Sequence, residues 1–258
     1  MPSPVGKLAG GPRSAWTVAG PEEVVGWFTF DPTSVDDRLP EFVRFVTVGE
    51  LANGGVLWAV QYLSEHPSHA ARGVSFLEIV RADTFAIDGR EPYWPEGGAA
   101  AVWFARILPK DSSTQLGSGL PLLMLEFWVP DSSYVTFMRQ RGHYATYGDV
   151  RLRRRHDRWE GSITGADLTV SVRCTPSGAE SGGPSSSGSQ VLVPPETSGL
   201  RTIIHIAFAG HRERSCSEAT SWTIQGRHPL SSTLPIESAS FQSGYRLRGW
   251  AETAGPGP

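Results

Sequence analysis

The order of apolar and polar positions along the chain is dominated by one long apolar run. Residues 122–129 are apolar except for Glu126, and the run stops at Pro130-Asp131. Residues 134–150, which follow, are polar and punctuated by glycine. An apolar run of this length predicts a buried strand. A buried strand that passes into a polar segment can present side chains to a cavity, so we expect the functional site near this junction.

Other strands are predicted where β-branched and aromatic residues lie between turn residues. The first covers residues 24–30. Asp31-Pro32 then favours a short helix with Asp31 as N-cap, ended by Pro40. Residues 150–172 are predicted to form a hairpin that turns at residues 159–161. Further strands are predicted at residues 42–48, 56–63, 74–81, 99–108, 203–208, 219–224 and 244–250.

Two stretches are expected to lie outside the core. Residues 1–20 are rich in glycine, proline and small side chains, which is typical of a flexible leader. Residues 177–190 are almost entirely Ser, Gly, Ala and Pro, so a disordered loop is expected over residues 177–198. The many short strands on either side of that loop predict one mostly-β domain, a barrel or a sandwich, over residues 21–252.

Charge argues against several kinds of partner. The 258 residues carry a net charge of −3, so no strong attraction to nucleic acid or to anionic membranes is expected. No stretch approaches the roughly 20 apolar residues that span a bilayer. Residues 153–158 contain four arginines, but no aromatic residues are interleaved with them as in nucleic-acid sites. We interpret this run as a solvated strand end.

Cysteine and histidine give no metal signature. Cys174 and Cys216 are the only cysteines and have no metal-type spacing. With no apolar secretory segment near the start, they predict a cytoplasmic protein with two free thiols. His66 and His69 flank Pro67 in a predicted surface turn. We therefore expect no metal and no cofactor.

Three motifs resemble the acetoacetate decarboxylase family, and they follow one another in the same order as in that family. Residues 28–41 are similar to its strand, Asp-Pro, short helix and Leu-Pro-Glu. Residues 128–147, with 159–161 and 168–170 after them, resemble its active-site segment and hairpin. His228-Pro229-Leu230 and residues 234–237 are similar to its C-terminal signature. The resemblance implies a single large closed β-barrel or cone, with a few short helices, around an apolar cavity.

In that family a cavity lysine forms a Schiff base with a keto acid. The best-fitting segment here, residues 139–146, keeps Gly142 but has Ala145 where the lysine belongs. Alanine cannot form an imine, so the family's chemistry is not carried over. Lys7 and Lys110 are the only lysines, and Lys110, beside Asp111, is poorly placed for the role.

The hypothesis that we favour is an enzyme of small-molecule, secondary metabolism, of the kind found in antibiotic biosynthesis. It would bind a carbonyl-containing, largely apolar substrate in the cavity and promote a lyase, isomerase or cyclisation step without an imine. Glu78 is similar to the family's cavity glutamate. The expected catalytic residues are Glu78, Arg141, His143 and Tyr144, and the expected substrate contacts are Phe76, Trp128, Arg139 and Tyr147.

Two alternatives stay open. One is a decarboxylase of the family's type that uses Lys110 as its nucleophile. The other is a non-catalytic protein that binds an apolar metabolite in a cavity lined by aromatic and aliphatic side chains. The sequence does not decide the oligomeric state, and a homo-oligomer is compatible with it.

Overall fold

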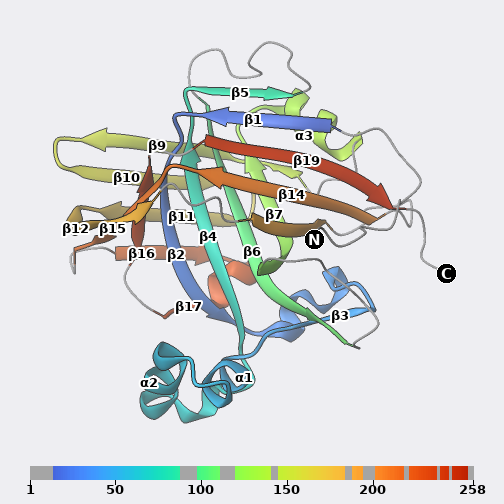
Figure 1. Cartoon of the computed structure of the whole chain (residues 1–258), viewed down its shortest axis with the longest axis vertical. Coiled ribbons are helices and arrows are strands. Elements are labelled where there is room, and N and C mark those ends of the chain that lie inside the picture. Colours follow the sequence, from blue (N-terminus) through green and yellow to red (C-terminus); the bar gives the residue numbers. More distant parts are fainter. Residues whose placement is uncertain are drawn as a thin grey trace, which may run out of the picture.

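The computed structural model describes residues 14–87, 98–110, 120–140, 145–183, 188–193, 201–217, 221–236, 239–243 and 246–254. Most of these residues lie in strands, which build two sheets (Figure 1). The 15-stranded sheet contains β1 (Ser14–Ala19), β2 (Glu22–Phe30), β3 (Val43–Phe45), β4 (Gly73–Arg81), β5 (Thr84–Ile87), β6 (Ala99–Pro109), β7 (Leu120–Val129), β8 (Ala145–Tyr147), β12 (Pro176–Gly183), β13 (Gly188–Val193), β14 (Arg201–Ala209), β15 (His211–Cys216), β17 (Leu234–Pro235), β18 (Ser240–Ser243) and β19 (Arg246–Ala254).

The second sheet has four strands, in the order β16-β11-β10-β9. These are β9 (Asp149–Arg155), β10 (Arg158–Thr164), β11 (Leu168–Cys174) and β16 (Ser221–Gly226). Helices are few and short: α1 (Val48–Asn53), α2 (Leu57–Glu65) and α3 (Ser132–Gln140), with 3-10 turns η1 (Pro32–Arg38), η2 (Pro67–His69) and η3 (Pro229–Ser232). The structure is therefore mostly β, as expected.

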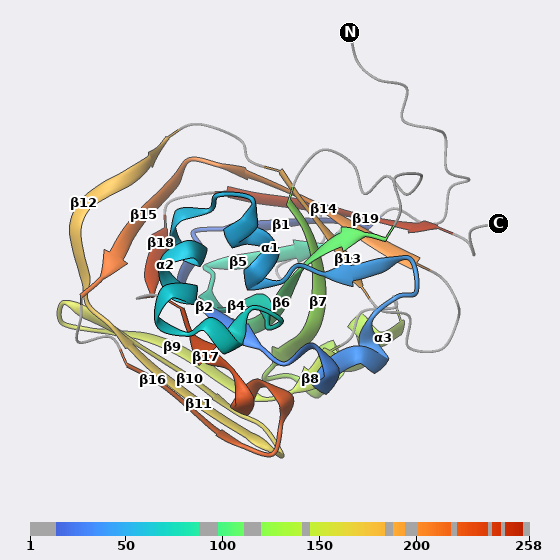
Figure 2. The same ribbon diagram turned by 90° about the horizontal axis from the view of Figure 1, so that it is seen from below.

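The large sheet follows the order β12-β15-β18-β2-β4-β6-β7-β13-β14-β19-β1-β5. It curves so strongly that β14, β19 and β1 cross one face of its middle strands, β4, β6 and β7 (Figures 1 and 2). The four-stranded sheet covers the opposite face of the same strands (Figure 2). Strands β2, β4, β6 and β7 are thus covered on both sides, which explains their near-continuous apolar sequences.

The two faces of these central strands carry separate apolar clusters. We call the side toward the four-stranded sheet the inter-sheet face, where Leu77, Trp103 and Leu125 pack against Leu152 and Val170. We call the side toward β1 the interior face, and Val18 of β1 packs there. Alternation along each strand assigns its side chains to one face or the other.

The closed barrel is not confirmed. Within the described residues, the path of the large sheet has two ends, at β12 and at β5, and no pairing joins them. The sheet curls over itself instead, and the four-stranded sheet covers its outer side (Figure 2).

Two expectations about flexible segments are corrected. Residues 14–19 of the expected leader form β1, which pairs with β19 and β5. Within the expected loop over residues 177–198, β12 pairs with β15, and β13 pairs with β7 and β14. Backbone pairing between distant strands needs no apolar side chain, so composition could not reveal it. Residues 1–13, 184–187 and 194–198 lie outside the described part.

Residues 56–63 are predicted as a buried strand, but residues 57–63 belong to helix α2, and Val56 is its N-cap. Ala59 and Tyr62 are buried, one helical turn apart, while Leu57 is 71% exposed. Short apolar runs do not distinguish a strand from a helix by periodicity. A helix forms here because only one side of the segment is buried, and the other side faces solvent.

The turn predicted at residues 159–161 is also misplaced. Trp159 to Gly161 lie inside β10, and the chain reverses at His156 and Asp157, where His156 has a φ of 59°. The predicted hairpin is therefore part of a longer meander, β9-β10-β11. The arginines of residues 153–158 are exposed at this reversal, and Arg155 and Arg158 pair with Glu160.

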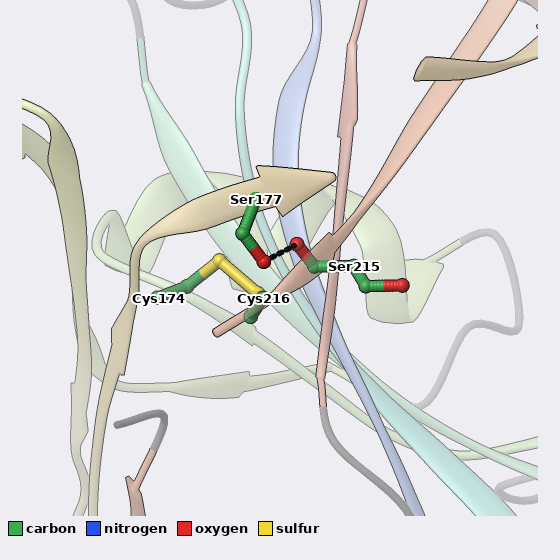
Figure 3. Close-up of a disulfide and its surroundings, with 4 residues drawn as sticks. All are labelled: Cys174, Ser177, Ser215 and Cys216. Atoms are coloured by element: carbon green, nitrogen blue, oxygen red, sulfur yellow. Dashed lines mark hydrogen bonds between the residues drawn. A yellow bond between two sulfur atoms is a disulfide. The ribbon is translucent and has the colours of Figure 1, made fainter. Parts of the chain in front are cut away.

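The cysteines are not free thiols. Cys174 at the end of β11 and Cys216 at the end of β15 form a disulfide, with their Cα atoms 5.1 Å apart (Figure 3). Beside it, the Ser177 hydroxyl donates a hydrogen bond to the Ser215 carbonyl oxygen, at 3.3 Å. The disulfide joins the four-stranded sheet to the large sheet. Disulfides persist mainly in oxidising compartments, so the cytoplasmic prediction loses its cysteine argument.

No helix in the described ranges is both long enough and apolar enough to cross a membrane.

Candidate functional site

The interior face of β2, β4, β6 and β7 is a nearly continuous apolar surface. Its buried members come from four strands, from α3 and from β8: Val25, Phe76, Ala100, Val102, Phe104, Leu122, Met124, Phe127, Val129, Tyr134, Val135 and Ala145. Phe76 and Phe104 are backbone partners at its centre, with ring centroids 5.1 Å apart. Such a surface suits a largely apolar ligand.

Two carboxyl groups interrupt this apolar surface. Glu78 lies on β4 in alternation with Phe76 and Val80, and its backbone partner on β2 is Val25. Glu23 lies two residues before Val25 on β2, on the same face, and is 4% exposed. Burial, and then the charge of Glu23, raise the pKa of Glu78 well above its usual range. Carboxyl groups at neighbouring positions of one face disfavour one another's negative charge.

Glu78 is not sealed off from solvent. It is half-buried, whereas its strand neighbours Leu77 and Ile79, on the other face, have no exposed surface. Burial is nevertheless the largest cause of its raised pKa. A carboxyl group that is enclosed by protein yet accessible can meet a small molecule.

A guanidinium group lies at the other end of the same face. Arg106 continues the alternation of Val102 and Phe104 on β6, and its backbone partner on β7 is Leu122. Its side-chain Nε is enclosed and has no hydrogen-bond partner. Burial lowers the pKa of Arg106.

Helix α3 covers one edge of the interior face. Asp131 caps it, because its Oδ1 accepts hydrogen bonds from the backbone nitrogens of Ser133 (2.7 Å) and Tyr134 (3.2 Å). Arg139 in its last turn donates from Nε to the carbonyl oxygen of Ala145, at 2.8 Å. Ala145, the position that resembles the family's lysine, is fully buried in the interior-face cluster.

The structure brings some predicted site residues together and separates others. Phe76 shares the interior face with Glu78. Trp128 does not, because it points to the inter-sheet face and is 2% exposed there. Tyr147 is 57% exposed at the end of β8, and Arg139 is exposed on α3. Arg141, His143 and Tyr144 lie outside the described residues.

Of the two lysines, the structure describes Lys110, which does not lie at this face. Lys110 follows the end of β6 and is exposed to solvent. Its backbone nitrogen donates to the carbonyl oxygen of Phe42, at 3.0 Å. Lys7 lies outside the described residues.

A second polar cluster, which the sequence did not predict, lies on the inter-sheet face around Glu126. Arg38 donates from NH1 to Glu126 Oε2 at 2.6 Å, and Thr146 donates to Oε1 at 2.6 Å. The Nε2 of His228 lies 3.4 Å from Oε2, while its Nδ1 accepts from the backbone nitrogen of Leu230.

Burial pushes the pKa of Glu126 upward, but the hydrogen bonds from His228 and Thr146 and the charge of Arg38 outweigh it, so the pKa is lowered. A β-bulge makes this position unusual: Trp103 pairs with Glu126 and Phe104 with Met124, so Leu125 is the extra residue of β7. The signal in the sequence was a lone acidic residue within an apolar run. Because its partners occupy η1, β8 and the start of η3, we interpret it as a buried cross-link rather than a ligand site.

Metal binding has no support in the described ranges, where no group of three or more His, Cys, Asp or Glu side chains could hold an ion. His66 and His69 stack on one another with ring centroids 5.1 Å apart, and Tyr62 bonds the His69 Nδ1 at 2.9 Å. The two imidazoles thus pack against one another, and that of His69 also forms a hydrogen bond.

Comparison with known proteins gives the fold. No protein-family model matches the sequence, and no curated protein matches it. Solved structures do match. They include an acetoacetate decarboxylase-like enzyme from Sphingomonas wittichii RW1, at 10% identity and a TM-score of 0.56, over 98% of this chain and 97% of that one. An acetoacetate decarboxylase from Legionella pneumophila matches at 10% identity and 0.53, over 98% and 90%.

The enduracididine biosynthesis enzyme MppR, in complex with pyruvate, matches at 10% identity and a TM-score of 0.55, over 94% of this chain and 88% of that one. These likenesses confirm the resemblance drawn from the motifs: the chain has the acetoacetate decarboxylase-like fold. At this identity they concern the fold and not the reaction.

Proposed function

We propose that this chain is a small-molecule enzyme that binds a carbonyl compound against the interior face and moves a proton with Glu78 and Glu23, without forming an imine. The observation that carries the proposal is the pair of carboxyl groups on an apolar surface, with the pKa of Glu78 raised by burial and by Glu23. Raised carboxyl pKa values at neutral pH are typical of acid–base catalysts.

The two groups have complementary tasks. Protonated Glu78 donates a hydrogen bond to the carbonyl oxygen, and ionised Glu23 removes a proton from the adjacent carbon. The electron pair of the broken C–H bond forms the new C=C bond, the π pair of the carbonyl moves to the oxygen, which takes the proton of Glu78, and an enol results. Where a C=C bond is conjugated with the enol, protonation of its far carbon completes an isomerisation, and attack of the enol carbon on a second carbonyl completes a cyclisation. In both cases the O–H proton of the enol returns to Glu78 as the carbonyl re-forms. Neither outcome needs a cofactor.

Two further observations support an imine-free reaction. Ala145 offers a buried methyl group at the position that resembles the family's lysine, and Lys110 lies in solvent beyond β6. The structural neighbour MppR is described with pyruvate and also with the condensation product of pyruvate and imidazole 4-carboxaldehyde. Carbonyl ligands therefore occur on this fold, which supports a carbonyl substrate here.

The test is exchange of α-hydrogens for deuterium, followed by NMR, with pyruvate and a series of methyl ketones in D₂O. E78Q and E23Q should each lower the exchange rate by roughly 10², whereas D149N, at an exposed position, should leave it unchanged. Borohydride added during turnover should leave the protein mass unaltered.

Three results would count against this function. Exchange that survives E78Q removes Glu78 from the chemistry. A borohydride adduct on Lys110 restores the decarboxylase alternative. Tight ketone binding with no exchange in the wild type indicates the non-catalytic binding protein.

A further inference from the structure

Arg106 is the one strongly basic group on the described interior face of β6. Val102 and Phe104 precede it at alternate positions and belong to the interior-face cluster, while Ala105 and Ile107 belong to the inter-sheet cluster. Alternation therefore places the Arg106 side chain on the same face as Glu78. Its Nε is enclosed without a partner, and the structure gives its guanidinium no ion pair with a described carboxylate.

An unpaired guanidinium in apolar surroundings is costly. Desolvating a charge is unfavourable by several kcal/mol unless an opposite charge or hydrogen bonds compensate for it. The neighbours of Arg106 on this face, Phe104 and Leu122, supply neither. Burial lowers the pKa of Arg106, which agrees with this account. A carboxylate has the planar, two-oxygen geometry that a guanidinium binds best.

Register gives the spacing between the two polar ends of the face. Glu78 pairs with Val102, four residues before Arg106 on the neighbouring strand. Four residues of strand correspond to about 13 Å. Side chains stand roughly perpendicular to a sheet, so the two functional groups keep about this separation. The Phe76–Phe104 pair occupies the interval.

We propose that Arg106 binds the carboxylate of a substrate whose reactive carbonyl lies at Glu78, several carbons away. Hydrogen bonds of roughly 3 Å at each end leave about 7 Å between the carbonyl and carboxylate oxygens of the ligand, which an alkyl segment over the two phenyl rings can span. The substrate class is thus an oxo acid with its acid group remote from its ketone. A 3-oxo acid, in which one carbon separates the two groups, does not reach both. This inference rests on the proposed function for the role of Glu78 but not for the role of Arg106.

The test compares ligands that differ only in the acid group. Binding of 7-oxooctanoate, 2-octanone and 3-oxobutanoate is measured calorimetrically for the wild type, R106M, E78Q and the control R151M. Arg151 is an exposed arginine paired with Asp149. We expect the wild type to bind 7-oxooctanoate at least about tenfold more tightly than 2-octanone. R106M should lose that preference, and R151M and E78Q should keep it.

Thermal unfolding separates binding from a structural role. R106M removes a half-buried charge that is paired with no described carboxylate, so its Tm should equal or exceed that of the wild type. A lower Tm with equal weakening of the acid and the ketone would mean that Arg106 is structural, and a preference that persists in R106M would also overturn the inference. Equal affinity for 3-oxobutanoate and 7-oxooctanoate would overturn the remote spacing.

The same variants keep the two proposals distinct. If E78Q retains deuterium exchange while R106M loses the preference for the acid, the proposed function fails and the role of Arg106 stands. If E78Q loses exchange while R106M keeps the preference for the acid, the role of Arg106 fails and the proposed function stands.

Discussion

Glu23 and Glu78 lie diagonally across from one another on neighbouring strands. Glu78 is paired with Val25, and Glu23 precedes Val25 by two residues on the same face. Diagonal neighbours in a sheet are within reach of long side chains. Two carboxyl groups so placed on an apolar surface influence one another's proton, which is why the pKa of Glu78 is raised by Glu23 as well as by burial.

The raised pKa of Glu78 predicts a pH-dependent stability. The folded protein keeps the proton at pH values where the unfolded chain, with a pKa near 4.5, has lost it. The contribution is therefore fully present below that pH and is lost as the pH rises through the folded-state pKa. E78Q does not titrate, so its free energy of unfolding relative to the wild type should increase with pH in that window. Urea unfolding at several pH values measures it.

The control for this experiment is E41Q, at an exposed position, whose difference from the wild type should stay flat over the same range. A flat profile for E78Q too would show that Glu78 ionises in the folded state as it does in the unfolded chain.

Removing Glu23 should shift the titration of Glu78 downward. Glu23 raises the pKa of Glu78 through its charge, and E23Q removes that charge while it keeps the shape of the side chain. The pH at which the Glu78 carboxyl titrates, followed by NMR of carbon-13-labelled glutamate with E78Q for assignment, should fall in E23Q relative to the wild type. An unchanged midpoint would show that burial accounts for the whole shift.

The Glu126 cluster should contribute strongly to stability. E126Q deprives the half-buried Arg38 of its charged acceptor but leaves it the Leu125 carbonyl oxygen, and loss of one partner of a buried ion pair costs up to about 3–5 kcal/mol. The side chains of Arg38 and Glu126 are 16% and 6% exposed. The exposed pair Arg151–Asp149, broken by D149N, should contribute less than about 1 kcal/mol. Urea unfolding of both variants at neutral pH gives the comparison.

The same cluster predicts the opposite pH dependence from Glu78. Because the pKa of Glu126 is lowered in the folded protein, its contribution is present above the unfolded-chain value and is lost as the pH falls. The difference between E126Q and the wild type should therefore shrink in acid. Equal differences at pH 7 and in acid would contradict the ion-pair account.

The Cys174–Cys216 disulfide closes a segment of 42 residues. A cross-link of that length restricts the unfolded chain by about 4 kcal/mol in the chain-entropy model, with measured values usually between about 2 and 4. The C174S/C216S double variant should lose stability by that amount in urea. In the oxidised wild type, iodoacetamide should label no thiol, since neither of the two cysteines is free. Labelling of the native protein would contradict the bridge.

Gly26 is required by the packing of Trp222. A Cβ atom at Gly26 would lie 2.6 Å from the ring atoms Cε2 and Cζ2 of Trp222, closer than real contacts allow. G26A should therefore cost about 1–3 kcal/mol. G54A is the matched control, because its nearest atoms lie 3.4 Å away and its effect should stay within about 0.5 kcal/mol.

A double variant tests the same contact. If the cost of G26A comes from Trp222, combining it with W222L should cost less than the two single variants together. Strict additivity would place the strain elsewhere on β2.

The sequence by itself determined the central strands and one local helix. Residues 24–30, 74–81, 99–108 and 122–129 became strands where their apolar patterns predicted, because each run is bounded by turn residues and long enough to cross a core. The turn after Asp31 formed as predicted because capping depends on neighbours in the chain: the Asp31 side chain accepts from the backbone nitrogen of Thr33. The motif order also led to the right fold.

Only the tertiary structure decided which residues meet. Residues 57–65 became a helix because one side of them faces solvent, and β12 formed because β15 supplied its hydrogen bonds. The Cys174–Cys216 bridge, the Glu126–Arg38 pair and the place of Glu23 beside Glu78 all join segments far apart in the chain. Alternation tells which side chains share a face of a strand, but the register and the curvature of the sheet decide what that face meets. Those depend on backbone pairing over long distances, which leaves little trace in local composition.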